Sequence, residues 1–271
     1  MTPAPLATTT QWVLNRLPTW PLIIVAVGLA MALAMAGNRL MRKRLPPDRP
    51  WEHNDVAGAI LAVVTGLYGL VLAFVIVVVW EDFRSTQDSV SSEATALAQL
   101  VRDSRAFPEP TRDEISQHVA GYVQVVIDRE WHLMASGRES PVAAARLDDL
   151  FTTVEHFQPE TPSETTFHQE AAGALNTAVF SRRARIFASS NSIPQPLVLL
   201  IVGGAFVCVG FLFFLRVPNP RAQSVMLLSV TALLTFELLL ALLLSNPFSG
   251  DVTVSNKPLR SGALEALYHQ R

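Results

Sequence analysis

The chain is organised around one uninterrupted run, DVAGAILAVVTGLYGLVLAFVIVVVW (Asp55–Trp80) followed by EDFRSTQDSVSSEATALAQLVRDSR (Glu81–Arg105). After Asp55 the first half carries no charge, and its length is enough to cross a bilayer as a helix. The second half is polar and amphipathic, and no proline occurs between Pro50 and Pro108. We therefore predict one helix of roughly 50 residues, roughly 75 Å long, that starts in the membrane and continues beyond it.

A stripe of residues at alternating steps of three and four runs along this predicted helix, which is the heptad pattern of a packed seam. In the membrane half the stripe is mostly alanine and glycine, and small residues let membrane helices approach closely. Two interpretations stay open: the stripe packs against the other membrane helices of the same chain, or several copies of the helix surround an axis and line a pore. The members of this heptad stripe are Asp55, Ala59, Ala62, Gly66, Gly69, Ala73, Ile76 and Trp80, then Phe83, Gln87, Val90, Ala94, Leu97 and Val101.

The composition agrees with membrane residence. Half of the 271 residues are hydrophobic and the mean hydropathy is +0.31, which is too apolar for an ordinary soluble protein. The net charge of -2 comes without a basic patch, so we expect no nucleic-acid partner. Cys208 is the single cysteine, which permits neither an intrachain disulfide nor a cysteine-based zinc site.

Three further apolar stretches, at 22–37, 197–215 and 222–244, predict three more membrane spans. The predicted fold is an all-α membrane protein with four transmembrane helices, the second of which continues into a helical soluble insert between spans two and three. The expected parts are an N-terminal tail (1–17), spans one and two (18–80), the insert (81–195), spans three and four (196–245) and a mobile C-terminal tail (246–271).

Local signals place the helix ends inside the insert. Thr111 to Glu114 reads as a capping box, and Gly137 is expected to end the helix that this box begins. Ser140 followed by Pro141 predicts the start of the next helix, and Ser163 the start of the last.

The basic residues predict the orientation. The two short links between spans are rich in arginine and lysine, which by the positive-inside rule makes them cytoplasmic and puts both termini and the insert outside. The arginines at 182, 183 and 185, near the third span, argue the other way. The basic residues of the links are Arg39, Arg42, Lys43, Arg44, Arg49, Arg216 and Arg221.

Signatures of enzymes are missing from the sequence: it has no glycine-rich phosphate loop, no His-Glu-x-x-His, no Gly-x-Ser-x-Gly and no cysteine pair. Its six histidines show no ligand spacing. We therefore expect no catalytic role, no metal site and no cofactor.

A few polar residues are candidates for function. Glu237 falls within the fourth span, where a carboxylate is costly; it either bonds to a neighbouring helix or serves as an ion or proton site, and Gln223 shares its helical face. His53, Asn54 and Asp55 form a polar cluster that either caps the long helix or lies at a pore mouth, where a ring of Asp55 carboxylates would favour cations.

Arg182 and Arg185 belong to a basic group that we expect at the end of the last insert helix. There they would suit the helix dipole, or contact lipid head groups or the acidic pair Glu81 and Asp82.

Several short motifs stand out along nearly the whole chain: His53–Gly58, Tyr68 to Trp80-Glu81, Glu93-Ala94, Tyr122 with Glu130-Trp131, Arg182 with Arg185, and Pro247-Phe248-x-Gly250. Together they resemble the bacterial bestrophin-like family of unknown function. The family's proline after the Glu-Trp pair is replaced by His132. The resemblance implies a remote relation to bestrophins, which are pentameric anion channels with a helical soluble domain, although no bestrophin pore motif matches and Asp55 does not suit anions.

Our first interpretation is a homo-oligomer, with five subunits by family analogy, that passes small ions across the lipid bilayer along an axis lined by the long helix. The alternative is a membrane-anchored sensor or scaffold whose insert binds a partner. A third interpretation, a proton-coupled transporter that uses Glu237, lacks the inverted repeat found in many transporters.

Overall fold

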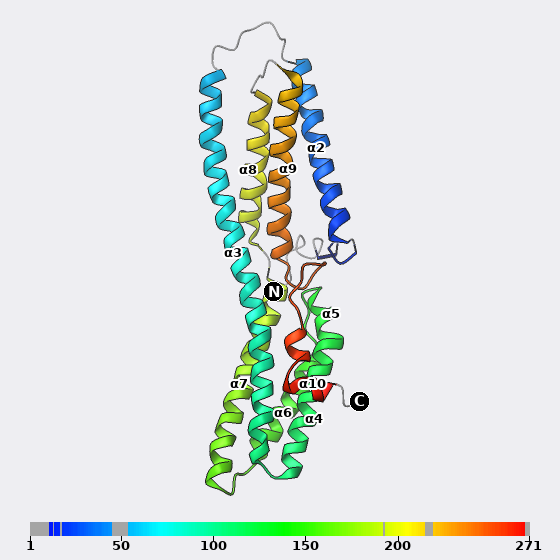
Figure 1. Ribbon diagram of the computed structural model, residues 1–271, viewed down its shortest axis with the longest axis vertical. Coiled ribbons are helices and arrows are strands. Elements are labelled where there is room, and N and C mark those ends of the chain that lie inside the picture. Colours follow the sequence, from blue (N-terminus) through cyan, green and yellow to red (C-terminus); the bar gives the residue numbers. More distant parts are fainter. Residues whose placement is uncertain are drawn as a thin grey trace. The chain divides into compact units, whose positions relative to one another are not determined.

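The computed structural model describes residues 11–12, 14–16, 18–44, 54–191, 193–214 and 219–268. Within these residues all regular secondary structure is helical (Figure 1). The chain divides into two compact units. The membrane unit comprises Arg16–Glu81 and Ile193–Ser245, and the insert unit comprises Met1–Asn15, Asp82–Ser192 and Asn246–Arg271. The long predicted helix is present as α3 (Asn54–Asp103) and contributes to both units.

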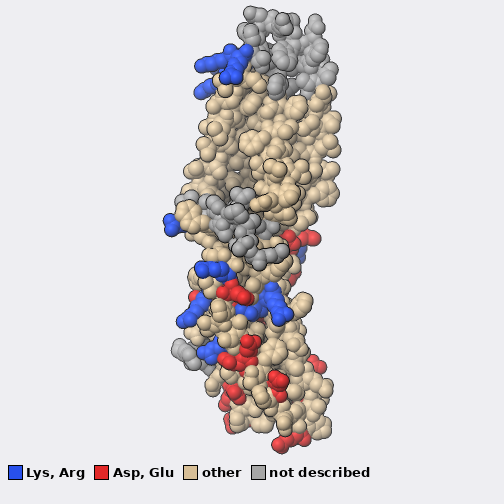
Figure 2. All heavy atoms as spheres, turned by 180° about the vertical axis from the view of Figure 1, so that it is seen from behind, with Lys and Arg blue, Asp and Glu red and all other residues tan. Residues whose placement is uncertain are grey.

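Among the described residues, four helices are long and apolar enough to cross a membrane, as the sequence predicted: α2 (Thr19–Arg44), α3, α8 (Gln195–Phe214) and α9 (Pro220–Leu244). The face of these helices that Figure 2 shows is almost free of charge, and basic side chains gather where α2 ends. The fold is therefore an all-α membrane protein in which one membrane helix continues into the insert.

Close contacts fix the helices of the membrane unit against one another. The Tyr68 hydroxyl on α3 donates a hydrogen bond of 2.7 Å to the Ile201 carbonyl on α8. Gly204 lies directly against the Tyr68 ring. A Cβ added at this glycine would approach the ring to 2.4 Å. Between α2 and α9, the Arg42 guanidinium donates to the side-chain oxygen of Gln223, which is buried.

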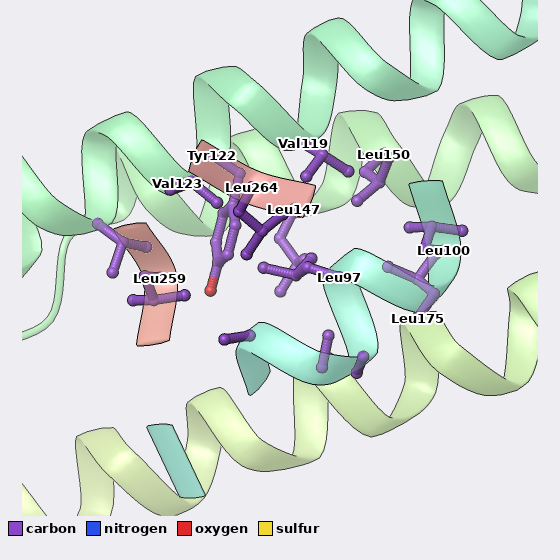
Figure 3. Close-up of a cluster of buried hydrophobic side chains, with 14 of the residues drawn as sticks. Leu97, Leu100, Val119, Tyr122, Val123, Leu147, Leu150, Leu175, Leu259 and Leu264 are labelled. Atoms are coloured by element: carbon purple, nitrogen blue, oxygen red, sulfur yellow. The ribbon is translucent and has the colours of Figure 1, made fainter. Parts of the chain in front are cut away.

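The insert unit is a helical bundle around one apolar core. After a short 3₁₀ turn at Ser104–Ala106, the chain forms α4 (Glu109–Val125), a π-helical turn (Val126–Glu130), α5 (Trp131–Met134), α6 (Pro141–His156) and α7 (Pro162–Ser190). Figure 3 shows how the core draws side chains from each layer: Leu97 and Leu100 of α3, Val119 and Tyr122 of α4, Leu147 and Leu150 of α6, and Leu175 of α7.

Two of the predicted helix boundaries are confirmed. Gly137 has a φ of 65° and follows the end of α5, and Ser140 caps α6 by accepting a hydrogen bond from the Ala143 amide. The capping box expected at Thr111 is wrong, because α4 already begins at Glu109 after Pro108. A capping box does form at the start of α7, between Thr161 and Glu164.

The C-terminal tail, which we expected to be mobile, belongs to the insert core. It contains the 3₁₀ turn Lys257–Arg260 and α10 (Ala263–Tyr268). Its apolar side chains Phe248, Val254, Leu259 and Leu264 are all buried in that core. The burial of the tail was not predicted from the sequence, because these side chains follow no helical or strand period.

The expected N-terminal tail also contacts the insert. The Asn15 side chain donates to the Ala135 carbonyl at 2.8 Å, and Ser249 of the C-terminal segment donates to the same carbonyl at 2.9 Å. Both chain ends therefore attach to the turn that follows α5.

Candidate functional site

In the membrane half of α3, the small members of the heptad stripe face away from the rest of the chain. We call these exposed residues the small-residue stripe: Ala59, Ala62, Gly66, Gly69 and Ala73. A Cβ added at Gly66 or Gly69 would meet no side chain or neighbouring backbone of the described chain within 4 Å. Ile76 is partly buried and Trp80 is half-exposed. The interpretation that this stripe packs against the chain's own membrane helices is therefore wrong.

A different stripe of α3 faces inward. It consists of larger side chains, and it too follows heptad spacing: Leu61, Tyr68, Leu72, Val75 and Val79. A third, bulky face is exposed and includes Leu67, Leu70 and Phe74. Bulky apolar side chains suit contact with lipid, whereas a ridge of small residues suits contact with another helix.

The predicted mouth lies at the first turn of α3, because Asn54 and Asp55 begin that helix. His53 lies outside the described residues, and the side chains of Asn54 and Asp55 are not among those described. The carboxylate ring therefore stays a prediction. An acid in the first turn also suits the positive end of the helix dipole.

Glu237 is half-buried on α9, and the described part of the chain gives its carboxyl group no hydrogen bond. Both interpretations of Glu237, a bond to a neighbouring helix and an ion or proton site, therefore stay predictions. Gln223 instead serves the contact between α2 and α9 described above, so the two residues do not form one site.

Beyond the membrane, the heptad stripe is covered. Val90, Ala94 and Leu97 are buried in the insert core, although Gln87 stays exposed. Glu93, which lies beside this part of the stripe, is fully buried as well. Glu93 belongs to a cluster of charged side chains that was not predicted from the sequence.

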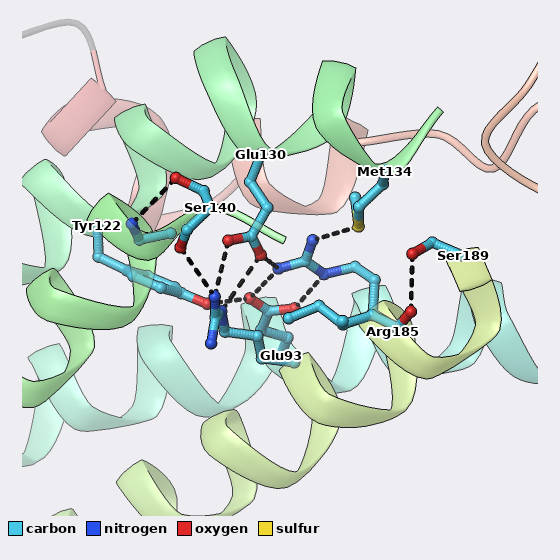
Figure 4. A network of polar contacts seen from close by, with 10 residues as sticks. Glu93, Tyr122, Glu130, Met134, Ser140, Arg185 and Ser189 are labelled. Carbon is cyan, nitrogen blue, oxygen red and sulfur yellow. Dashed lines mark hydrogen bonds and ion pairs between the residues drawn. The ribbon is translucent and has the colours of Figure 1, made fainter. Parts of the chain in front are cut away.

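The charge cluster joins α3, the π-helical turn and α7 (Figure 4). The Arg185 guanidinium donates to both carboxylate oxygens of Glu93, at 2.7 Å from Nε and 3.0 Å from Nη2. Its Nη2 also donates to Glu130 at 3.1 Å. Arg182 donates to Glu130 through Nε at 3.2 Å and Nη2 at 2.8 Å. Two arginines and two glutamates thus balance in charge.

Neighbouring groups complete the cluster. The Tyr122 hydroxyl donates to Glu93 at 2.6 Å, and the Arg185 guanidinium carbon lies 5.6 Å from the centroid of the Trp131 ring. Trp131 in turn meets Phe248 edge-on, with ring centroids 5.4 Å apart, which ties the C-terminal segment to the same centre. The extra residue of the π-helical turn falls where Glu130 must reach both arginines.

The electrostatics show why these charges tolerate burial. Burial, together with the nearby Glu93 charge, raises the pKa of Tyr122 well above its ordinary value, so the phenol stays a donor. Burial alone would lower the pKa of Arg185, but the charge and hydrogen bonds of Glu93 outweigh it and raise that pKa. The same balance, with Glu130 as partner, raises the pKa of Arg182. Each arginine is therefore held charged by the glutamate that it contacts, and the cluster works as a structural centre.

The expected positions of Arg182 and Arg185 need correction. Helix α7 continues to Ser190, so neither arginine lies in its last turn, and both are buried against Glu130 and Glu93 rather than exposed to lipid head groups, Glu81 or Asp82. A signal was present in the sequence, because both arginines follow Ala171, Ala174 and Ala178 on the face of α7 that enters the core.

Fold and site together define an all-helical membrane protein. Its long second span continues into a helical unit that contains buried ion pairs. The model of the bestrophin-like domain family matches residues 28–259, so the chain belongs to the bestrophin-like family. No curated protein and no solved structure matches the chain.

Proposed function

We propose that the chain assembles as a homo-oligomer through the small-residue stripe of α3 and passes small ions along an axis lined by that helix. The observation that carries this proposal is the exposure of the stripe in the single chain, while the inward face of the same helix is packed. Helices that meet through small residues approach closely, and rotational copies of one such contact close into a ring.

Ion flux into liposomes tests the proposal, with native protein compared with Gly69→Leu. We expect Gly69→Leu to abolish flux or reduce it severalfold, because the larger side chain occupies the helix contact or the axis. Gly28→Leu on α2 is the matched control, since Gly28 also has open space around its Cβ position. Equal flux from both variants, or no flux from well-assembled native protein under voltage and pH steps, would contradict the channel proposal.

The orientation belongs to the same proposal: a bacterial inner membrane, arginine-rich links in the cytoplasm, and the termini and insert outside. A cysteine at the exposed Ser136, in a Cys208→Ser background, is then expected to react with an impermeant maleimide on spheroplasts. Labelling only after lysis would reverse the orientation.

The sensor or scaffold alternative also has an observation in its favour. Phe180 and Phe187 on α7 are 77% and 68% exposed, which is unusual for phenylalanine in a helical unit in water. Assembled protein that carries no current would favour this alternative.

A further inference from the structure

A cavity of about 730 Å³ lies between α6 and α7 in the insert unit, and neither the pore proposal nor the charge cluster accounts for it. Its volume falls within the roughly 300–1,000 Å³ that is usual for small-molecule sites. Its lining residues on α7 extend from Asn176 to Ser190, a length of roughly 21 Å at 1.5 Å per residue, so the cavity is elongated.

Most of the cavity wall is hydrocarbon. Leu147 and Phe151 contribute from α6, and Val179, Ile186 and Phe187 from α7. Such a wall favours a ligand with an extended apolar part, because burial of apolar surface stabilises the complex roughly in proportion to area.

A cationic group lies in this apolar wall. Arg182 lines the cavity although its side chain is only 9% exposed. Its Nε and Nη2 donate to Glu130, and Nη2 also reaches the Ser140 carbonyl at 3.4 Å, whereas Nη1 has no partner among the described residues. Arg183, which is exposed, lines the cavity beside it. The Ser140 contact also sets the guanidinium next to the N-terminus of α6, whose dipole favours an anion.

Two exposed acids, Glu139 and Asp148, also line the cavity, while the charge of Arg182 is already balanced by Glu130. These acids would repel a multiply charged head group such as a phosphate monoester. A single negative charge on a long apolar body satisfies both the arginines and the hydrocarbon wall. We propose that this cavity binds a long-chain carboxylate, with its head group at Arg182 and Arg183 and its chain along the apolar wall.

Photo-crosslinking tests the proposal on full-length protein in phospholipid nanodiscs. The probes are a diazirine-bearing palmitic acid, the matching alcohol and the matching alkyl phosphate. The acid is expected to label peptides of α6 and α7, with unlabelled palmitic acid competing, while the alcohol and the phosphate label them weakly. Equal labelling by all three probes, or acid labelling confined to the membrane helices, would overturn the proposal.

Variants sharpen the test. Arg183→Gln is expected to weaken labelling by the acid about tenfold, the effect of losing one charge-assisted hydrogen bond. Val179→Trp is expected to abolish it by filling the cavity. Arg146→Gln, on an exposed α6 residue outside the cavity lining, is the matched control and should label like native protein. Equal losses in Arg183→Gln and Arg146→Gln would refute the assigned head-group site. Arg183 is exposed, so its variant stays informative even if Val179→Trp fails to fold.

Discussion

The two halves of α3 carry the same heptad stripe, but they meet different surroundings. In the insert unit the stripe residues Val90, Ala94 and Leu97 are covered by the chain's own core. In the membrane unit Ala62, Gly66 and Gly69 are left exposed, and the chain packs another face of the helix instead. One periodicity therefore serves folding in one half and, in our proposal, assembly in the other.

The difference follows from solvent. Water makes exposure of an apolar stripe costly, so in the insert half other helices and the C-terminal segment cover it. Lipid exerts no such force between helices, so an apolar stripe can stay open in a monomer until close packing with another helix favours contact. Substitutions in each half test this distinction, and the largest effect is expected in the covered half.

Removal of one partner of the buried Glu93–Arg185 pair should destabilise the insert unit most. Glu93→Ala leaves the Arg185 guanidinium without its main counter-charge in a site with no exposure, and we expect a loss of about 3–5 kcal/mol. Chemical unfolding followed by near-ultraviolet circular dichroism measures this loss.

The double variant Glu93→Leu with Arg185→Met is the control for this prediction. Replacing both charges with apolar groups of similar size should recover much of the lost stability, because no buried charge stays unpaired. A double variant as unstable as the sum of the single variants would show that packing, rather than charge compensation, holds this centre together.

Glycine substitutions in the membrane unit distinguish a packed helix face from an exposed one. Gly204→Ala should destabilise the membrane unit by about 1–3 kcal/mol, because its Cβ would meet the Tyr68 ring at 2.4 Å. Gly66→Ala, on the small-residue stripe, should leave the monomer unchanged. Thermal unfolding of the two variants in detergent gives the comparison, and equal melting temperatures would remove the distinction between the faces.

Sequence patterns were enough for the four spans and for α3, since a long charge-free run without proline leaves few alternatives. They could not decide what covers the stripe, because a period identifies a face but not its neighbour. The charge compensation of Arg185 was unpredictable for a related reason. It depends on Glu93 and Glu130, which lie 92 and 55 residues away along the chain, and local patterns hold no information on such pairs.

The smallest expected effect concerns Asp103, a buried carboxylate at the end of the covered half. Unlike Glu93 it has no ion-pair partner in the described chain, and its Oδ2 forms no hydrogen bond there. Burial raises the pKa of Asp103 and the charge of Glu170 adds to this, against a side-chain hydrogen bond from Gln99 and the charge of Arg102. The folded protein therefore holds this proton more tightly than the unfolded chain does.

Stability should accordingly fall as pH rises from the unfolded pKa of Asp103 through its raised folded pKa, since the folded state binds more protons across that window. Asp103→Asn stays neutral, so it should be more stable than native protein above this window and differ little below it. Unfolding curves at a series of pH values measure the difference, with Asp88→Asn on an exposed part of α3 as the control. A constant difference at every pH would mean that Asp103 acts through its shape rather than its charge, and the contrast with the compensated Glu93 would fail.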